Sequence, residues 1–139
     1  MKFYSILIPL VLLPILLEAK ISDTQIPATI ETYFQMNRLG PELISTEVIN
    51  HRQSGRAIKI SIIASRNKSA RDLAFTFAAA AAVANMAERP FELLWVEMDI
   101  NFKGAETTVA LAPANCTIDA LIFGNTATDK WWDDCLQFP

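Results

Sequence analysis

The segment of residues 69–88 constrains the fold most strongly, because it is apolar around nearly the whole circumference of a helix. Arg89-Pro90 ends the segment, and Ser69 with Asp72 resembles a capping box in which Asp replaces Glu. Two apolar stripes at helical spacing comprise Leu73, Phe77, Ala80, Ala84 and Ala87, and Phe75, Ala79, Ala82 and Met86. A helix that is apolar on all sides is a buried one, and this one is too short and alanine-rich for a good membrane span. We therefore predict a central helix that packs one stripe on a sheet and the other on a further layer.

Alternating residues on both sides of this helix predict two β-hairpins. The expected strands are residues 43–50 and 57–65 before the helix, and residues 92–102 and 106–112 after it. Inward-facing side chains are expected at Ile58, Ile60, Ile62, Ala64, Leu94, Val96, Met98, Ile100, Phe102, Val109 and Leu111. The polar segment 51–56 contains a turn glycine and is expected to close the first hairpin.

Two more helices are predicted, one before the first hairpin and one in the C-terminal tail. Pro27 suits the first turn of a helix over residues 27–39, and Gly40-Pro41 is a stop signal. A short helix is expected around residues 129–136. The order α-ββ-α-ββ plus a C-terminal tail predicts an α+β domain, with two β-hairpins flanking the alanine-rich helix and a four-stranded sheet packed on that helix. If the second and third strands are neighbours, the central helix is a right-handed crossover between parallel strands.

The N-terminus has the pattern of a secretory signal peptide. Lys2 precedes the apolar run 6–17, which is shorter than the ~20 apolar residues that a membrane-spanning helix needs. Pro9 and Pro14 also fit a removable segment better than a regular spanning helix.

We therefore predict that residues 1–19 are a signal peptide and that residues 20–139 form one mature domain. The protein would be secreted or periplasmic, with no membrane attachment after cleavage. Leu17 departs from the small residue usual three positions before a cleavage site. The alternative is a membrane anchor formed by residues 3–17.

Cys116 and Cys135 are the only cysteines in the sequence. An even number in an exported protein favours a disulfide, which here would close a loop of about 20 residues and contribute roughly 3 kcal/mol. We predict that the two are bonded to each other and tie the tail to the sheet; two free thiols are the alternative. Asn67 and Asn115 each begin an N-glycosylation pattern, which matters only if the source is eukaryotic.

The sequence contains no recognisable catalytic motif. Gly-x-Ser-x-Gly, His-Glu-x-x-His and glycine-rich phosphate loops are all absent, and a single histidine, His51, excludes every multi-histidine metal site. We expect no cofactor and no metal. We therefore favour an exported non-catalytic binding domain, whose partner is a protein or a small anionic ligand. The alternative is a small exported hydrolase in which folding brings a carboxylate near His51.

The net charge of −3 gives no general attraction to nucleic acid or anionic membranes. Residues 51–71 nevertheless carry only basic charges, at Arg52, Arg56, Lys59, Arg66, Lys68 and Arg71. The second strand, at ~3.3 Å per residue, separates the two ends of this stretch by ~30 Å. The basic residues therefore form two small clusters rather than one nucleic-acid surface.

The second basic cluster leads into the central helix. Arg66, Lys68, Ser69 and Arg71 surround backbone N–H groups that, with the helix dipole, favour an anion or an acidic partner. In the alternative interpretation, the Ser69 and Asp72 side chains satisfy those N–H groups as ordinary caps.

Trp95 is expected on the polar face of the third strand, beside Glu97 and Asp99. Either the first helix or the tail covers this face, or Trp95 and Ile63 form an exposed apolar spot suited to a partner. Trp131 and Trp132 lie close to Cys135 in the sequence and are expected to seal the core rather than to bind a ligand.

Overall fold

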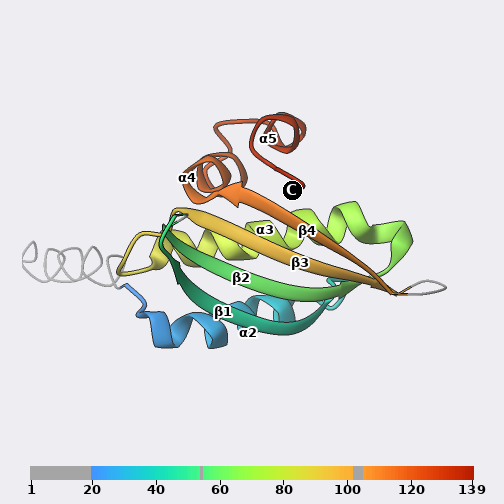
Figure 1. Ribbon diagram of the computed structural model, residues 1–139, viewed down its shortest axis with the longest axis horizontal. Coiled ribbons are helices and arrows are strands. Elements are labelled where there is room, and N and C mark those ends of the chain that lie inside the picture. The colour runs from blue at the N-terminus through green and yellow to red at the C-terminus, as the bar shows by residue number, and fades with distance from the viewer. Residues whose placement is uncertain (1–19, 54, 102–104) are drawn as a thin grey trace, which may run out of the picture.

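Four strands form one mixed sheet in the computed structural model, which describes residues 20–53, 55–101 and 105–139 (Figure 1). The strands are β1 (Glu42–His51), β2 (Gly55–Ala64), β3 (Leu93–Asn101) and β4 (Ala105–Pro113), and they lie side by side in chain order. Both hairpins are antiparallel, and β2 and β3 pair in parallel. The predicted α+β arrangement of two hairpins around one central helix is confirmed.

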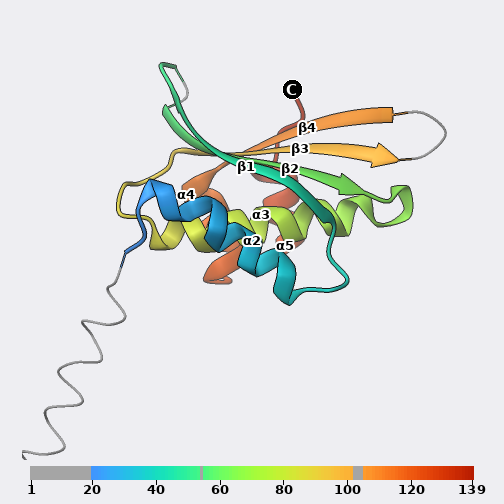
Figure 2. The ribbon, with the colours of Figure 1, turned by 90° about the horizontal axis from the view of Figure 1, so that it is seen from below.

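The central helix is α3 (Ser69–Met86), which connects the two parallel strands. It lies on one face of the sheet together with α2 (Ile26–Met36), as Figure 2 shows. The strand side chains beneath these helices are fully or almost fully buried, as expected, at Ile58, Ile60, Ile62, Ala64, Leu94, Val96 and Met98. Ile100 is half-buried on the same face, and Phe102 lies outside the described residues. The alternating pattern of β2 and β3 therefore identified the correct inner face.

Both stripes of α3 are in contact with other elements. Leu73, Phe77 and Ala80 are buried in the core, while the Phe75 ring packs edge-on against Phe34 of α2, with ring centroids 5.1 Å apart. Phe77 packs in the same manner on Trp131 of the tail, at 5.5 Å. The expected further layer is thus built from both α2 and the tail.

The C-terminal tail folds into α4 (Ala114–Thr117), the π-helical turn η3 (Ile118–Ile122) and α5 (Thr128–Asp134). Cys116 and Cys135 form the predicted disulfide, with Cα atoms 6.3 Å apart. The bond joins α4 to the end of α5, so it links two parts of the tail and does not tie the tail to the sheet as expected. After α5 the chain returns to the sheet, where Gln137 bridges the edge of β4 at Leu111. The short helix expected near residues 129–136 is confirmed.

Trp131 seals the core of the tail, in agreement with the sequence prediction. Its side chain is fully buried, and its indole N–H donates a hydrogen bond to Thr117 Oγ1 at 3.0 Å. Thr117 in turn donates to the Pro113 carbonyl at 2.8 Å. This relay connects the end of β4 to α5.

The structure corrects the expected inner face of the fourth strand. Ala110 and Ala112 are fully buried beneath the helices, whereas Val109 and Leu111 are half-buried on the other face. All four positions are apolar, so alternation gives no preference. The pairing register with β3 determines which residues face the helices, because Ala110 pairs with Val96 and Ala112 with Leu94.

The start of α3 also differs from the expectation. A 3₁₀ turn, η2 (Arg66–Lys68), precedes the helix, and the N-cap position falls at Lys68 with no side-chain cap. Ser69 Oγ donates to the Arg66 carbonyl at 3.3 Å, and the Asp72 carboxylate accepts from the backbone of Ser65. The capping box therefore does not form.

The first described residues are bonded to the end of α3. The backbone N–H of Ile21 donates to the Met86 carbonyl at 2.9 Å, and the Ile21 carbonyl accepts from Glu88 at 2.8 Å. The predicted signal peptide, residues 1–19, lies outside the described residues. No helix in the described ranges is long and apolar enough to cross a membrane.

Candidate binding surfaces

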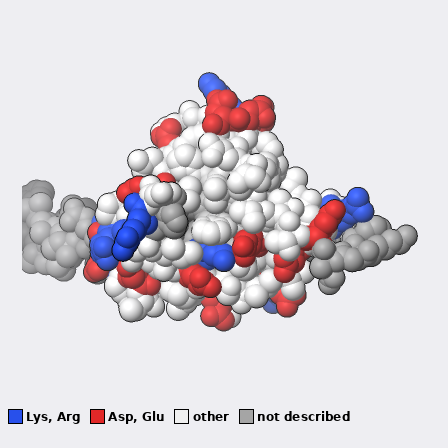
Figure 3. All heavy atoms as spheres, viewed as in Figure 1, with Lys and Arg blue, Asp and Glu red and all other residues white. Residues whose placement is uncertain are grey.

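Among the described residues, no helix lies on one face of the sheet. Both α2 and α3 lie on the opposite face (Figure 2), which excludes the first helix as a cover for Trp95. The pairing register places the side chains of the open face in rows across the sheet. One row near the β1–β2 turn holds Ile49, Ala57 and Leu93, and the next one away from the turn holds Glu47, Lys59, Trp95 and Leu111. Figure 3, which views this face, shows a continuous uncharged area bordered below by acidic and basic side chains.

A cavity of about 260 Å³ opens on this face beside Trp95. Its walls come from all four strands and the last residue of the tail: Ile49, Ala57, Leu93, Trp95, Val109, Leu111 and Pro139. The tail thus contributes to the Trp95 surface only at its end. Trp95 itself is half-buried, and its indole nitrogen is buried with no hydrogen-bond acceptor among the described residues.

Charged side chains lie along the open face next to this cavity. Lys59 Nζ stands 5.0 Å from the centre of the Trp95 ring and 3.3 Å from a carboxylate oxygen of Glu97. Asp99 accepts a hydrogen bond from the Thr107 hydroxyl at 2.9 Å. The surface therefore changes from apolar to acidic along β3, over a few residues.

The predicted anion-binding residues Arg66, Lys68, Ser69 and Arg71 lie on the other side of the molecule, where η2 leads into α3. The structure does not bring them together with Trp95. A guanidinium N–H of Arg71 donates to the Leu39 carbonyl at 2.9 Å, and Ser69 is turned toward the Arg66 carbonyl. Arg66 also has an interaction within the protein, so at least three of the four side chains have partners in their own chain.

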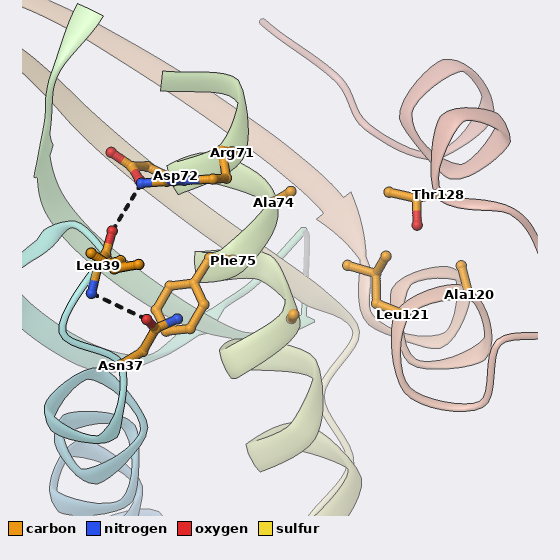
Figure 4. Close-up of a pocket in the computed structure, with 11 residues that line it drawn as sticks. Asn37, Leu39, Arg71, Asp72, Ala74, Phe75, Ala120, Leu121 and Thr128 are labelled. Atoms are coloured by element: carbon orange, nitrogen blue, oxygen red, sulfur yellow. Dashed lines mark hydrogen bonds and ion pairs between the residues drawn. The ribbon is translucent and has the colours of Figure 1, made fainter. Parts of the chain in front are cut away.

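A groove of about 520 Å³ runs beside Arg71, between the loop after α2, the first half of α3 and the tail (Figure 4). Phe75 and Leu39 lie on one side of it and Leu121 on the other. Sequence reasoning missed this groove because its walls come from separate segments that no periodic pattern relates. Of its lining residues, only Arg71 had been predicted to bind a ligand, while Asp72 and Phe75 had been assigned to capping and packing of the central helix.

Asp72 stands at the end of this groove and is 4% exposed. Burial raises the pKa of its carboxyl above the ordinary value of 3.8, and the nearby charges of Arg71 and Lys68 and the Ser65 backbone oppose that rise. The distance to the Arg71 guanidinium is 3.9 Å. The cost of burying the Asp72 carboxylate is thus partly offset by groups of its own chain.

The hydrolase alternative gains no support from the described residues. His51 ends β1 opposite Gly55, but its side chain lies outside the described part of the structure. Within residues 20–53, 55–101 and 105–139, no group of three or more His, Cys, Asp or Glu side chains is placed to hold a metal ion.

The comparisons with known proteins offer no relative. No protein family matches the sequence, and neither a curated protein nor a solved structure is significantly similar to it.

Proposed function

We propose that the mature chain is an exported, non-catalytic domain that binds a partner protein through the open face of its sheet. The observation that carries this proposal is the apolar cavity beside Trp95, on the face that no helix of the described residues covers. Solvated faces of such sheets are usually polar. A contiguous apolar area with a polar border is instead typical of an interaction site.

The chemistry of the two surfaces favours the open face over the helix start. The cavity is lined by an aromatic residue together with aliphatic neighbours, and aromatic residues often dominate the binding energy of interfaces. At the helix start, Arg71 and Ser69 already have partners in their own chain. The small-anion interpretation of Arg66, Lys68, Ser69 and Arg71 therefore has less support.

Export is supported by the Cys116–Cys135 disulfide, because such bonds persist in oxidising compartments. We expect intact-mass analysis of the product outside the cytoplasm to give a chain that begins near Lys20. A mass that retains residues 1–19 would contradict cleavage.

A comparison of two surface variants tests binding. The mature domain is used to capture proteins from the extracellular fraction of its source cells, and Trp95→Ser is compared with Phe123→Ser. Phe123 is exposed to 60% and does not line the cavity, so its replacement is a matched loss of one aromatic ring. We expect Trp95→Ser to abolish capture of a specific partner and Phe123→Ser to preserve it, with both variants folded by circular dichroism. Equal capture by both variants would contradict the proposal.

A further inference from the structure

We infer that the occupant of the open face is an extended segment of a partner in which a large apolar residue is followed, two or four positions later, by Lys or Arg. This inference rests on the proposed function and adds the chemistry of the partner.

The first argument is the spacing of groups along β3. Trp95, Glu97 and Asp99 occupy alternate positions of the strand and therefore share the open face. Alternate residues of a strand are ~6.6 Å apart, and an extended segment laid along the sheet repeats at the same interval. In a segment that runs in the direction of β3, an apolar residue at the cavity thus brings its second and fourth successors to the two carboxylates.

The second argument is the charge of the face. The register places Glu42, Glu47, Glu97 and Asp99 on it, and Lys59 is the only basic residue among the described strand residues that share it. Lys59 already lies against Trp95 and Glu97. The uncompensated charge is therefore negative, and a partner with basic groups is electrostatically complementary to it.

The third argument is the size of the cavity. A cavity of ~150 Å³ is large enough to bind benzene, and this one measures about 260 Å³. It accommodates one Leu, Met or Phe side chain from the occupant, while the rest of the segment stays on the surface.

A second copy of this chain is a poorer occupant. Two copies packed face to face would bring their acidic rows together, and juxtaposed like charges oppose association. The chain's own tail is already present at Pro139, and the cavity exists beside it.

The inference is tested by selecting a random-peptide display library against the mature domain, with Trp95→Ser as the counter-selection. We expect the peptides that require Trp95 to share a large apolar residue with Lys or Arg two or four positions later. Val109→Lys keeps Trp95 in place and adds a positive charge beside the cavity, so it should also weaken these peptides if Trp95→Ser proves unstable.

The acidic side chains are then tested with a matched pair of double variants. Glu97→Gln with Asp99→Asn should weaken a selected peptide by roughly threefold to tenfold, as expected for two exposed ion pairs, and should reduce the salt dependence of binding. Asp133→Asn with Asp134→Asn removes the same charge from exposed positions in α5 and should leave binding unchanged.

The outcomes separate the two proposals. Trp95-dependent peptides without basic residues, or equal binding to Glu97→Gln/Asp99→Asn, would overturn the inference while the proposed function stands. A selection without any Trp95-dependent peptide would overturn both. A dimer in sedimentation that Trp95→Ser dissociates would identify a second copy as the occupant and also overturn the inference.

Discussion

The guanidinium of Arg56 donates two hydrogen bonds to the carboxylate of Asp23, one of 2.6 Å to Oδ1 and one of 2.9 Å to Oδ2. Arg56 also lies over the Phe91 ring, 4.4 Å from its centre, and donates to the Pro90 carbonyl at 3.2 Å. One side chain of β2 thereby holds both the 3₁₀ turn η1 (Asp23–Gln25), which starts the domain, and the loop before β3. The basic cluster predicted at this end of β2 is therefore in part structural.

This pair predicts a stability loss that depends on pH. The hydrogen bond from Arg56 lowers the pKa of Asp23 below 3.8. A carboxyl with a depressed folded pKa stabilises the fold above its unfolded pKa, and this contribution disappears as the pH falls through the folded pKa. Asp23→Asn should thus lower the melting temperature at pH 7 and match the wild type in strong acid. Asp133→Asn, an exposed control, should change little, and a pH-independent effect of Asp23→Asn would contradict this account.

For Asp72 we predict the opposite dependence of stability on pH. Its pKa is raised by burial, so the ionised carboxylate destabilises the fold once the pH rises above about 3.8, and the protonated form removes that penalty. Asp72→Asn retains an oxygen for the Ser65 N–H and carries no charge. Thermal unfolding at pH 7 should therefore show a higher melting temperature for Asp72→Asn than for the wild type. This difference should vanish below about pH 3.8. A variant that is less stable at neutral pH would show that the pairing with Arg71 outweighs burial.

Two threonines provide a matched test of hydrogen bonding. Thr117→Val removes both the acceptor of the buried Trp131 N–H and the donor to Pro113, and should cost about 1–3 kcal/mol. Thr46→Val removes a buried hydroxyl that has no partner in the described residues, and should be neutral or stabilising by up to about 1 kcal/mol. Urea unfolding of both variants measures their free energies of unfolding. Equal losses of stability in the two variants would contradict the assigned roles of these hydroxyls.

The alanines of α3 predict sensitivity to added volume. Ala80 is 1% and Ala84 8% exposed, so Leu at either position must push α3 away from its neighbours, which typically costs about 1–3 kcal/mol. Asn85→Leu places the same side chain at an exposed position of the same helix. Melting curves should show clear losses for Ala80→Leu and Ala84→Leu and a small effect for Asn85→Leu. Three equivalent curves would mean that α3 is not tightly enclosed.

Most of the fold could be predicted from local patterns. The alternation of Ile58, Ile60 and Ile62 and the continuous apolar surface of α3 determine the inner face and the central helix, and both are confirmed. Errors arose where local chemistry competed with the pattern. The helix α2 ends at Met36, before Gly40-Pro41, because Asn37 is extended and its side chain accepts the Leu39 N–H at 3.2 Å.

The candidate surfaces could be predicted only in part. Trp95 was identified because an aromatic residue interrupts a polar face, a signal contained in one strand. Apart from Leu93, the rest of its cavity comes from β1, β2, β4 and Pro139, and no periodicity relates residues in separate strands. The contacts of Arg71 with Leu39 and of Arg56 with Asp23 could not be predicted for the same reason, because the partners lie in distant segments of the sequence.

The two ends of the described chain lie in different surroundings, and this has a practical consequence for handling the protein. Ile21 is hydrogen-bonded beside the end of α3, on the helical side, whereas Pro139 forms part of the cavity wall on the open face. An affinity tag or a fusion partner joined after Pro139 would compete with any ligand for that cavity. The same extension placed ahead of Lys20 would leave the cavity accessible.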